Sequence, residues 1–237
     1  MELPEYLCQR RDEPEALSPT DRSWDGLPSM HLKETVTGSD PGPALATAVE
    51  AFWTERALYF RFTCKDDYVR ATMTRRDDPI YKEDVVEVFL SPTGSLIEYK
   101  EFELSPRNVQ FDAHIRNEGR VAVDTAWDAP GWRTEVFRAG EQGDWTCVWE
   151  LPFAALRVGS PRPGDVWRMN CYRIDRGKDR EDLYLAWSPT GAKNFHIPQR
   201  FGRLRFVQGL SGGAAPRLLH ISNAAYLAGE LPCCRSC

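Results

Sequence analysis

Glu87 and Glu103, on consecutive predicted strands, are the residues whose positions best suit ligand binding or acid–base catalysis. In segment 84–91, alternation places apolar side chains on one face and Glu87 on the other. Segment 98–105 repeats the pattern, with Tyr99, Glu101, Glu103 and Ser105 sharing one face. If these strands are neighbours in one sheet, the two carboxylates look onto the same surface. They could then accept hydrogen bonds from a ligand or act as the acid and base of a glycoside hydrolase.

Binding is favoured over hydrolysis at these two positions. Hydrolysis requires one carboxyl group that an apolar pocket keeps protonated. Both segments are interpreted as open and rich in charge, and such surroundings argue against a raised pKa. Hydrolysis by Glu87 and Glu103 is therefore the second interpretation, behind binding without catalysis.

A polar loop before the last predicted strand carries Asn194, Phe195 and His196. An exposed aromatic ring beside hydrogen-bonding groups suits a sugar, because the ring stacks on the C–H face of a pyranose. Amides and carboxylates bind the hydroxyls of such a ligand. The alternative is that Phe195 plugs the open end of the fold, as loop aromatics often do.

A β-rich fold must position these residues. Apolar alternation and turn residues predict ten strands, at 46–53, 57–64, 84–91, 98–105, 108–115, 132–139, 145–152, 165–174, 183–187 and 202–207. Their spacing of roughly 10 to 20 residues predicts an all-β, antiparallel β-sandwich, jelly-roll-like and of immunoglobulin-like size. One or two short helices are expected, the best of them at 152–158, between Pro152 and Gly159.

Composition divides the chain into three parts. Residues 1–44 are rich in Pro, Glu and Asp and are expected to form an irregular lead-in packed at one edge. Residues 45–208 contain the predicted strands and form the sandwich. Residues 209–237 begin with several glycines and are expected to be a linker and tail.

The 237 residues include 42% hydrophobic residues and carry a net charge of −5, which excludes wholesale disorder and disfavours nucleic acid as a partner. The sequence shows neither an apolar run long enough to span a membrane nor a signal peptide, so we expect no membrane partner and a cytoplasmic location by default. Scattered cysteines indicate buried thiols, and the crowded Cys233, Cys234 and Cys237 make a poor zinc signal. The oligomeric state is not predicted.

Four segments, in this order, resemble carbohydrate-binding module family 9 and the bacterial family-9-like domains around it. They are DDPIYKEDVVEVFLSP (77–92), EYKEFELSPRNVQFDA (98–113), WELPF (149–153) and AWSPTGAKNFHIPQRFGRLRF (186–206), and the resemblance covers about residues 20–208. It implies a noncatalytic β-sandwich that binds the ends of plant polysaccharides, glucose- or xylose-based, between two aromatic rings. A role in carbohydrate catabolism, beside glycosyl hydrolases, follows from the same resemblance.

The resemblance also implies roles for individual residues. Tyr81 and Phe195 stand at the two clamp positions, where relatives have Trp. Glu87 matches the carboxylate that binds sugar hydroxyls, and Asn194 matches an amide of the closing loop. At Glu103 and Ser105 the sugar-binding members have arginine and asparagine. The predicted site therefore contains Tyr81, Glu87, Glu103, Ser105, Asn194, Phe195 and His196, and its ligand is an oligo- or polysaccharide.

The resemblance raises two questions about cofactors, although binding itself requires none. Characterised members carry structural calcium, for which Asp77, Asp78 and Asp84 are the candidate ligands here. Related sandwiches bind haem through methionine and histidine, and the residues available for that third interpretation are Met73, Met169, His114 and His196.

Overall fold

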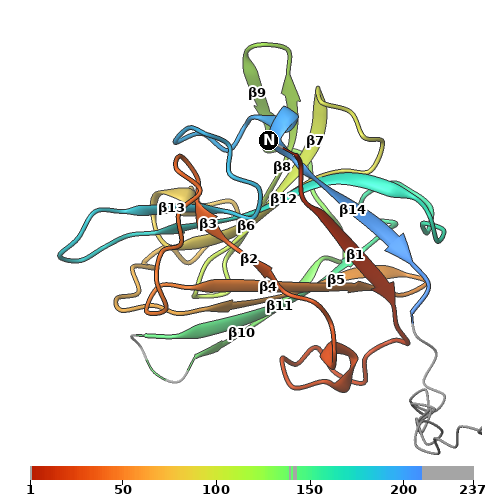
Figure 1. Cartoon of the computed structure of the whole chain (residues 1–237), viewed down its shortest axis with the longest axis horizontal. Coiled ribbons are helices and arrows are strands. Elements are labelled where there is room, and N and C mark those ends of the chain that lie inside the picture. The colour runs from red at the N-terminus through yellow and green to blue at the C-terminus, as the bar shows by residue number, and fades with distance from the viewer. Residues whose placement is uncertain (1, 139, 141–142, 210–237) are drawn as a thin grey trace, which may run out of the picture.

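The computed structural model describes residues 2–138, 140 and 143–209, which form one curled sheet (Figure 1). Its strands are β1 (Glu5–Arg10), β2 (Met30–His31), β3 (Lys33–Glu34), β4 (Thr47–Trp53), β5 (Ala57–Cys64), β6 (Val85–Ser91), β7 (Glu98–Leu104), β8 (Gln110–Asn117), β9 (Val121–Asp124), β10 (Arg133–Arg138), β11 (Trp145–Pro152), β12 (Val166–Asp175), β13 (Leu183–Ala186) and β14 (Gly202–Val207). The predicted β-rich fold is confirmed.

The sheet has the order β10-β11-β5-β4-β1-β14-β12-β6-β7-β8-β9, with β2, β3 and β13 beside this path. Strand β1 runs parallel to both of its neighbours, β4 and β14, whereas the other pairings in the described chain are antiparallel. The prediction of a purely antiparallel sheet is therefore wrong. The N-terminal strand β1 thus lies between β4 and β14, and all three strands run in the same direction.

The expected irregular lead-in contains this central strand. Tyr6 and Cys8 are buried, and the Tyr6 hydroxyl both donates to the carbonyl of Ala51 (3.0 Å) and accepts from its N–H (2.9 Å). Only these two side chains of β1 enter the core, so its apolar alternation is too short to stand out in the sequence. The division of the chain into three parts stays a prediction, and residues 210–237 lie outside the described residues.

The expected helix at 152–158 is a turn instead. Pro152 still pairs with Ala57 at the end of β11, and the N–H of Phe153 donates to the carbonyl of Arg56 (3.0 Å). Arg157 then adopts a positive φ of 58°, which a right-handed helix cannot accommodate. In the described chain, helical geometry is limited to short 3-10 turns, η1 (Arg22–Trp24), η2 (Ile80–Lys82) and η3 (Pro198–Arg200).

The main core lies between the two halves of the curled sheet. Trp132 illustrates the contact between them, because its ring lies 5.2 Å from Phe102 of β7 and 5.2 Å from Trp149 of β11. The predicted burial of scattered cysteines is confirmed for Cys8, Cys64, Cys147 and Cys171. None of the helical segments described is long and apolar enough to cross a membrane.

A second apolar cluster covers the opposite face of β12, β6, β7 and β8. Phe89, Tyr99, Phe111, Tyr172 and Phe195 belong to it. Alternation explains the division, because Val86 and Val88 of β6 point into the main core while Val85 and Phe89 point into the second cluster. The candidate site lies on this second face.

Candidate functional site

A cavity of about 550 Å³ opens on the second face. Its floor comes from β6, β7 and β8, and its rim comes from η2, β9, β13 and the loop before η3. The lining residues are Asp77, Pro79, Tyr81, Glu87, Phe89, Glu101, Glu103, Phe111, Val123, Thr125, Ile174, Tyr184, Lys193, Asn194, Phe195 and His196. The structure thus places six of the seven predicted site residues around one cavity.

Three glutamates form the polar part of the floor. Glu87 of β6 pairs in register with Glu103 of β7, and Glu101 lies two residues before Glu103 on the same face. Oxygen atoms of the three carboxyls lie within 4.8 Å of one another. All three side chains are buried, with exposures of 2% for Glu87, 6% for Glu101 and 1% for Glu103.

Burial raises the pKa of each of these carboxyls, because the ionised form loses its hydration. The pKa of Glu101 rises to about 7. The pKa values of Glu87 and Glu103 rise well above the ordinary value, and repulsion from the neighbouring carboxyls adds to the effect of burial. The expectation that open surroundings would leave these positions unshifted is wrong, because loops that lie far away in the sequence cover them.

Tyr81 is the exposed aromatic of the site. It belongs to η2, whose neighbouring residue Ile80 is fully buried and anchors the turn. The guanidinium of Arg176 donates to the Tyr81 carbonyl (2.6 Å). The Tyr81 ring is 42% exposed and meets Phe111 edge to face, with 6.2 Å between ring centres. The backbone is therefore fixed while the ring stays available to a ligand.

Phe195 combines the two roles that the sequence left open. Its ring lines the cavity, yet it is only 8% exposed and stacks on Tyr172 with 4.1 Å between ring centres. The Tyr172 hydroxyl also donates to the Phe195 carbonyl (3.0 Å). Phe195 therefore packs against the second cluster and presents only part of its ring to the cavity.

The neighbours of Phe195 are held by hydrogen bonds. The Asn194 side-chain oxygen accepts from the N–H of His196 (2.9 Å), and the His196 carbonyl accepts from Asn117 (3.0 Å). A hydrogen bond of 2.9 Å joins His196 Nδ1 to the hydroxyl of Tyr99. Burial lowers the pKa of His196 to about 4, so this imidazole is neutral at physiological pH.

Ser105 is the predicted site residue that does not line the cavity. It follows the end of β7, and its hydroxyl accepts from the N–H groups of Arg107 and Val109, each at 3.2 Å. It shapes the turn into β8. Conversely, the prediction omitted Glu101, although its position two residues before Glu103 places it on the same face and is visible in the sequence.

The three candidate calcium ligands do not form one donor set. Asp84 accepts from the N–H groups of Arg70 and Arg176, each at 2.6 Å. Asp78 accepts from the N–H of Arg75 (2.9 Å). Among the described residues, the acidic groups close enough to share a metal are Glu87, Glu101 and Glu103, and Asp66, Asp67 and Asp175. The arrangement lends no support to calcium at Asp77, Asp78 and Asp84, and the calcium prediction stays untested.

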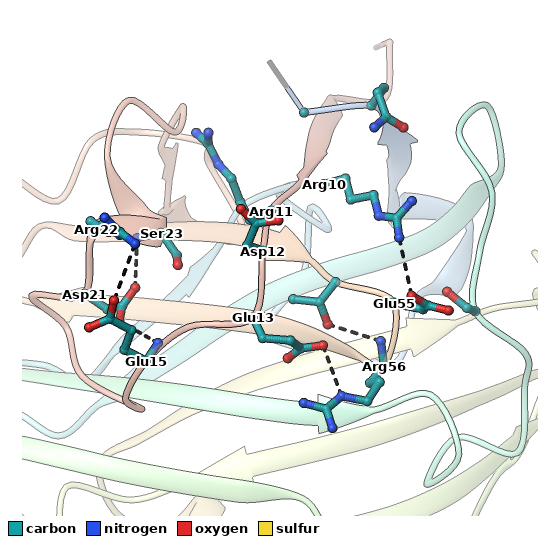
Figure 2. Close-up of a pocket in the computed structure, with 14 residues that line it drawn as sticks. Arg10, Arg11, Asp12, Glu13, Glu15, Asp21, Arg22, Ser23, Glu55 and Arg56 are labelled. Carbon is teal, nitrogen blue, oxygen red and sulfur yellow. Dashed lines mark hydrogen bonds and ion pairs between the residues drawn. The ribbon is translucent and has the colours of Figure 1, made fainter. Parts of the chain in front are cut away.

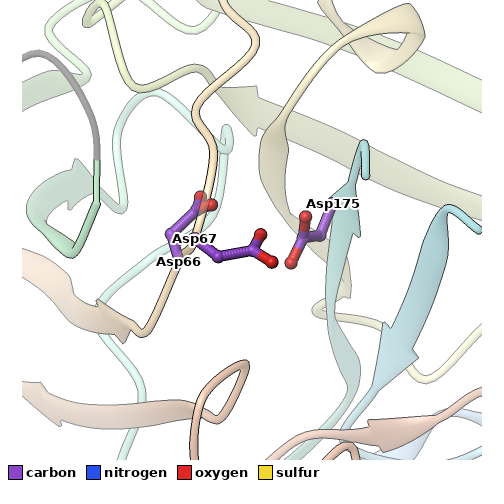
Figure 3. A group of neighbouring side chains, drawn as sticks. All are labelled: Asp66, Asp67 and Asp175. Atoms are coloured by element: carbon purple, nitrogen blue, oxygen red, sulfur yellow. The ribbon is translucent and has the colours of Figure 1, made fainter. Parts of the chain in front are cut away.

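The second acidic group, Asp66, Asp67 and Asp175, joins the end of β5 to the end of β12 (Figure 3). The buried guanidinium of Arg173 lies 2.9 Å from Asp66 and 3.1 Å from Asp175. Arg180 adds contacts of 2.7 Å to Asp175 and 3.0 Å to Asp67. Arginines thus neutralise this cluster, and its role is structural.

A larger cavity, of about 1070 Å³, lies beside η1 and the end of β1 (Figure 2). Six of its charged side chains form ion pairs: Glu13 contacts Arg56 (3.2 Å), Glu15 contacts Arg22 (3.4 Å) and Glu55 contacts Arg10 (3.7 Å). It offers neither an apolar wall nor a gathered set of unpaired groups. We therefore place the functional site in the smaller cavity.

The geometry gives no support to hydrolysis. Oxygen atoms of Glu87 and Glu103 lie within 4.8 Å, with a third carboxyl, Glu101, at the same spacing, rather than as an isolated pair of carboxyls. The pKa values of both carboxyls are raised, so neither is tuned to serve as an ionised base or nucleophile.

The haem interpretation gains no support either. Met169 lies in the main core, whereas His196 lines the cavity on the other face of the sheet. Met73 packs against the second cluster, and alternation along β8 directs His114 away from that cluster. The sheet therefore places Met169 and His114 on one face and Met73 and His196 on the other.

A family model matches most of the described sheet. The model of the carbohydrate family 9 binding domain-like proteins matches residues 18–209, and the chain belongs to this family. The family resemblance seen in the sequence is thus confirmed.

Particular relatives come from fungi and bacteria. An extracellular protein of the fungus Arthroderma benhamiae is 30% identical over 200 residues, covering 78% of this chain and 87% of the relative. A Bacteroides uniformis protein for which carbohydrate binding has been proposed has 22% identity and a TM-score of 0.70, covering 85% of this chain and 98% of its own. A family 9 module of Caldicellulosiruptor kristjanssonii in complex with cellotriose has 11% identity and a TM-score of 0.63, covering 90% of this chain and 98% of its own. A family 9 module of the same organism in complex with glucose has 13% identity and a TM-score of 0.63, covering 90% of this chain and 100% of its own.

Proposed function

We propose that this chain binds an oligo- or polysaccharide, without catalysis, in the cavity between Tyr81 and the Glu87–Glu101–Glu103 floor. The observation that carries the proposal is the juxtaposition of a half-exposed tyrosine ring with buried hydrogen-bonding groups in one cavity. An aromatic face and paired polar groups are what a pyranose requires.

The size and walls of the cavity support the same function. Drug-sized ligands occupy pockets of about 300 to 1,000 Å³, and a sugar of a few units falls in this range. Phe111 and Phe195 provide apolar wall, while Asn194 and Lys193 stand at the rim. Family membership and the cellotriose and glucose complexes of the Caldicellulosiruptor module favour glucose-type plant saccharides as the first ligands to try.

Isothermal titration calorimetry on the full chain tests the proposal. The panel contains cellotriose, xylotriose, glucose and amino sugars, each at up to about millimolar concentration. We expect saturable binding with a stoichiometry of one for at least one of them. Absence of a heat change with every sugar of the panel would overturn the proposal.

A further inference from the structure

The floor of the cavity contains three buried carboxyls that no arginine or lysine of the described residues pairs with. No basic side chain of the described residues forms an ion pair with Glu87, Glu101 or Glu103. Glu103 Oε2 is fully buried and has no hydrogen-bond partner, although Glu103 lines the cavity and is only 1% exposed. Native proteins rarely leave such an oxygen unsatisfied, so it indicates a missing partner.

The nearby basic groups are directed elsewhere. Arg176 binds Asp182 (2.8 Å), the hydroxyl of Tyr184 (2.8 Å) and the Tyr81 carbonyl (2.6 Å). Lys193 lies over the ring of Tyr184, with 5.7 Å between its nitrogen and the ring centre. The corresponding acidic cluster at Asp66, Asp67 and Asp175 differs in one respect, because Arg173 and Arg180 lie within ion-pair distance of its carboxylates.

The shape of the group selects an ammonium ion rather than a metal ion. An ammonium carries three N–H donors, and three carboxyls within 4.8 Å of one another can each accept one of them. Calcium takes about six to eight oxygen ligands, and magnesium takes about six. Here the surroundings of the carboxyls include Phe89, Phe111 and Ile174, which offer no oxygen from their side chains but suit the carbon skeleton of an organic cation.

We propose that the cavity selects saccharides that bear an ammonium group, such as units of glucosamine, with the nitrogen bound by the carboxyls of Glu87, Glu101 and Glu103. This inference rests on the saccharide-binding function proposed above and names its ligand class. The Tyr81 ring covers the sugar face, and the ammonium supplies the donors that Glu103 Oε2 lacks.

Binding of an ammonium sugar is expected to release protons. Burial keeps the carboxyls of the free protein partly protonated near neutral pH, and a bound cation favours their ionised form. The other titratable or charged groups facing the site are Asp77, Tyr81, Tyr184, Lys193, His196 and Arg176. Calorimetry in buffers of different ionisation enthalpy measures the number of protons released.

The test compares trimers of one β-1,4-linked skeleton: cellotriose, its 2-amino counterpart and the N-acetylated form of that counterpart. With the full chain at about pH 7.5, we expect the amino trimer to bind at least about tenfold more tightly than either neutral trimer. Equal or weaker binding of the amino trimer would refute the ammonium preference while leaving saccharide binding intact. Absence of binding by all three would count against the proposed function itself.

Variants locate the effect. Glu101→Gln and Glu103→Gln keep side-chain shape but remove the acidic group, and each should abolish the preference for the amino trimer. The affinity of each variant for cellotriose is the reference from which that preference is calculated. Glu98→Gln, at an exposed position of β7, is the matched control and should keep the preference. A preference retained in both floor variants would show nonspecific attraction to an acidic protein and refute the site.

Divalent metals form the last arm. Titration with calcium chloride or magnesium chloride should neither produce saturable binding that depends on Glu101 nor displace the amino trimer. Metal binding that is lost in Glu101→Gln would assign the cluster to a metal and overturn the proposal. Because the trimer comparison uses wild-type protein alone, its result stands even where a variant folds poorly.

Discussion

Glu87 of β6 and Glu103 of β7 stand directly opposite each other on adjacent antiparallel strands, both buried on the floor of one cavity. Like charges at such positions destabilise a sheet when both are ionised. When Glu87, Glu101 and Glu103 are ionised, their mutual repulsion therefore destabilises the folded state. Protonation lowers this repulsion, and a bound cation would also lower it. A purely structural sheet gains nothing from this arrangement, which is why we regard it as functional.

The first prediction concerns stability against pH. The pKa of Glu101 is about 7 in the folded protein and near 4.5 when unfolded, so the folded state binds more protons between these values. The free energy of unfolding should therefore fall as pH rises through this window, by about 1.4 kcal/mol for each unit of pKa shift. Urea denaturation at several pH values should show a shallower decline for Glu101→Gln than for wild type. An unchanged slope would mean that the carboxyl is solvated in the folded state.

The second prediction concerns the exposed ring. Tyr81→Ala removes the stacking surface, which contributes much of the contact area with a sugar, and should abolish measurable saccharide binding in calorimetry. Because the ring is 42% exposed, the melting temperature should change little. Phe137→Ala is the control, since Phe137 is similarly exposed (40%) but lies on β10, outside the cavity. If Tyr81→Ala bound saccharide with wild-type affinity, the Tyr81 ring would not be part of the binding site.

The third prediction separates packing from binding at Phe195. Its ring is nearly buried and stacked on Tyr172, so Phe195→Ala should cost about 3 kcal/mol or more of unfolding free energy. Chemical denaturation measures that loss. Phe195→Leu keeps most of the packing and should bind saccharide more weakly than wild type. If Phe195→Ala were as stable as Tyr81→Ala, the plug role would be refuted.

The fourth prediction concerns the ion pairs that join β5 to β12. Arg173 is fully buried between Asp66 and Asp175, and it also donates to the carbonyl of Lys65 (2.7 Å). Arg173→Met leaves buried carboxylates without a partner and should cost about 3 to 5 kcal/mol in urea denaturation. Arg116→Met removes an exposed arginine whose ion pairs lie in solvent, and should be nearly silent. A mild effect at Arg173 would mean that water reaches the cluster.

Much of the strand pattern could be predicted from the sequence, because strands β4 to β8 are runs of seven or eight residues that are rich in β-branched and aromatic side chains. The pattern does not predict the short central strand β1, the two-residue strands β2 and β3, or the strand β9. Strand β9 is intermediate to exposed and carries no apolar signal of burial. Local composition predicts a helix at 152–158, but the structure has a turn there. Composition does not show the long-range backbone contact between Phe153 and Arg56 that fixes this turn.

The sequence predicts which site residues share a face, but it does not predict their burial. Register and alternation placed Glu87 and Glu103 on one face correctly, because both depend only on neighbouring strands. They could not reveal that η2 and the loop through His196 cover that face. The loops that cover the face determine its solvent exposure, and solvent exposure determines the pKa values of the carboxyls. The raised pKa values of the three glutamates therefore could not be predicted from the sequence.

By itself, the sequence determined the β-rich fold, the family and the residues that face a common surface. Strand periodicity and local motifs depend on residues that are close together in the sequence, so they can be recognised without the structure. Only the tertiary structure decided which of those residues are buried, that Glu101 completes a group of three, and that Phe195 packs as well as lines the cavity. These are consequences of segments distant in sequence meeting in space, where burial changes the energy of a charge.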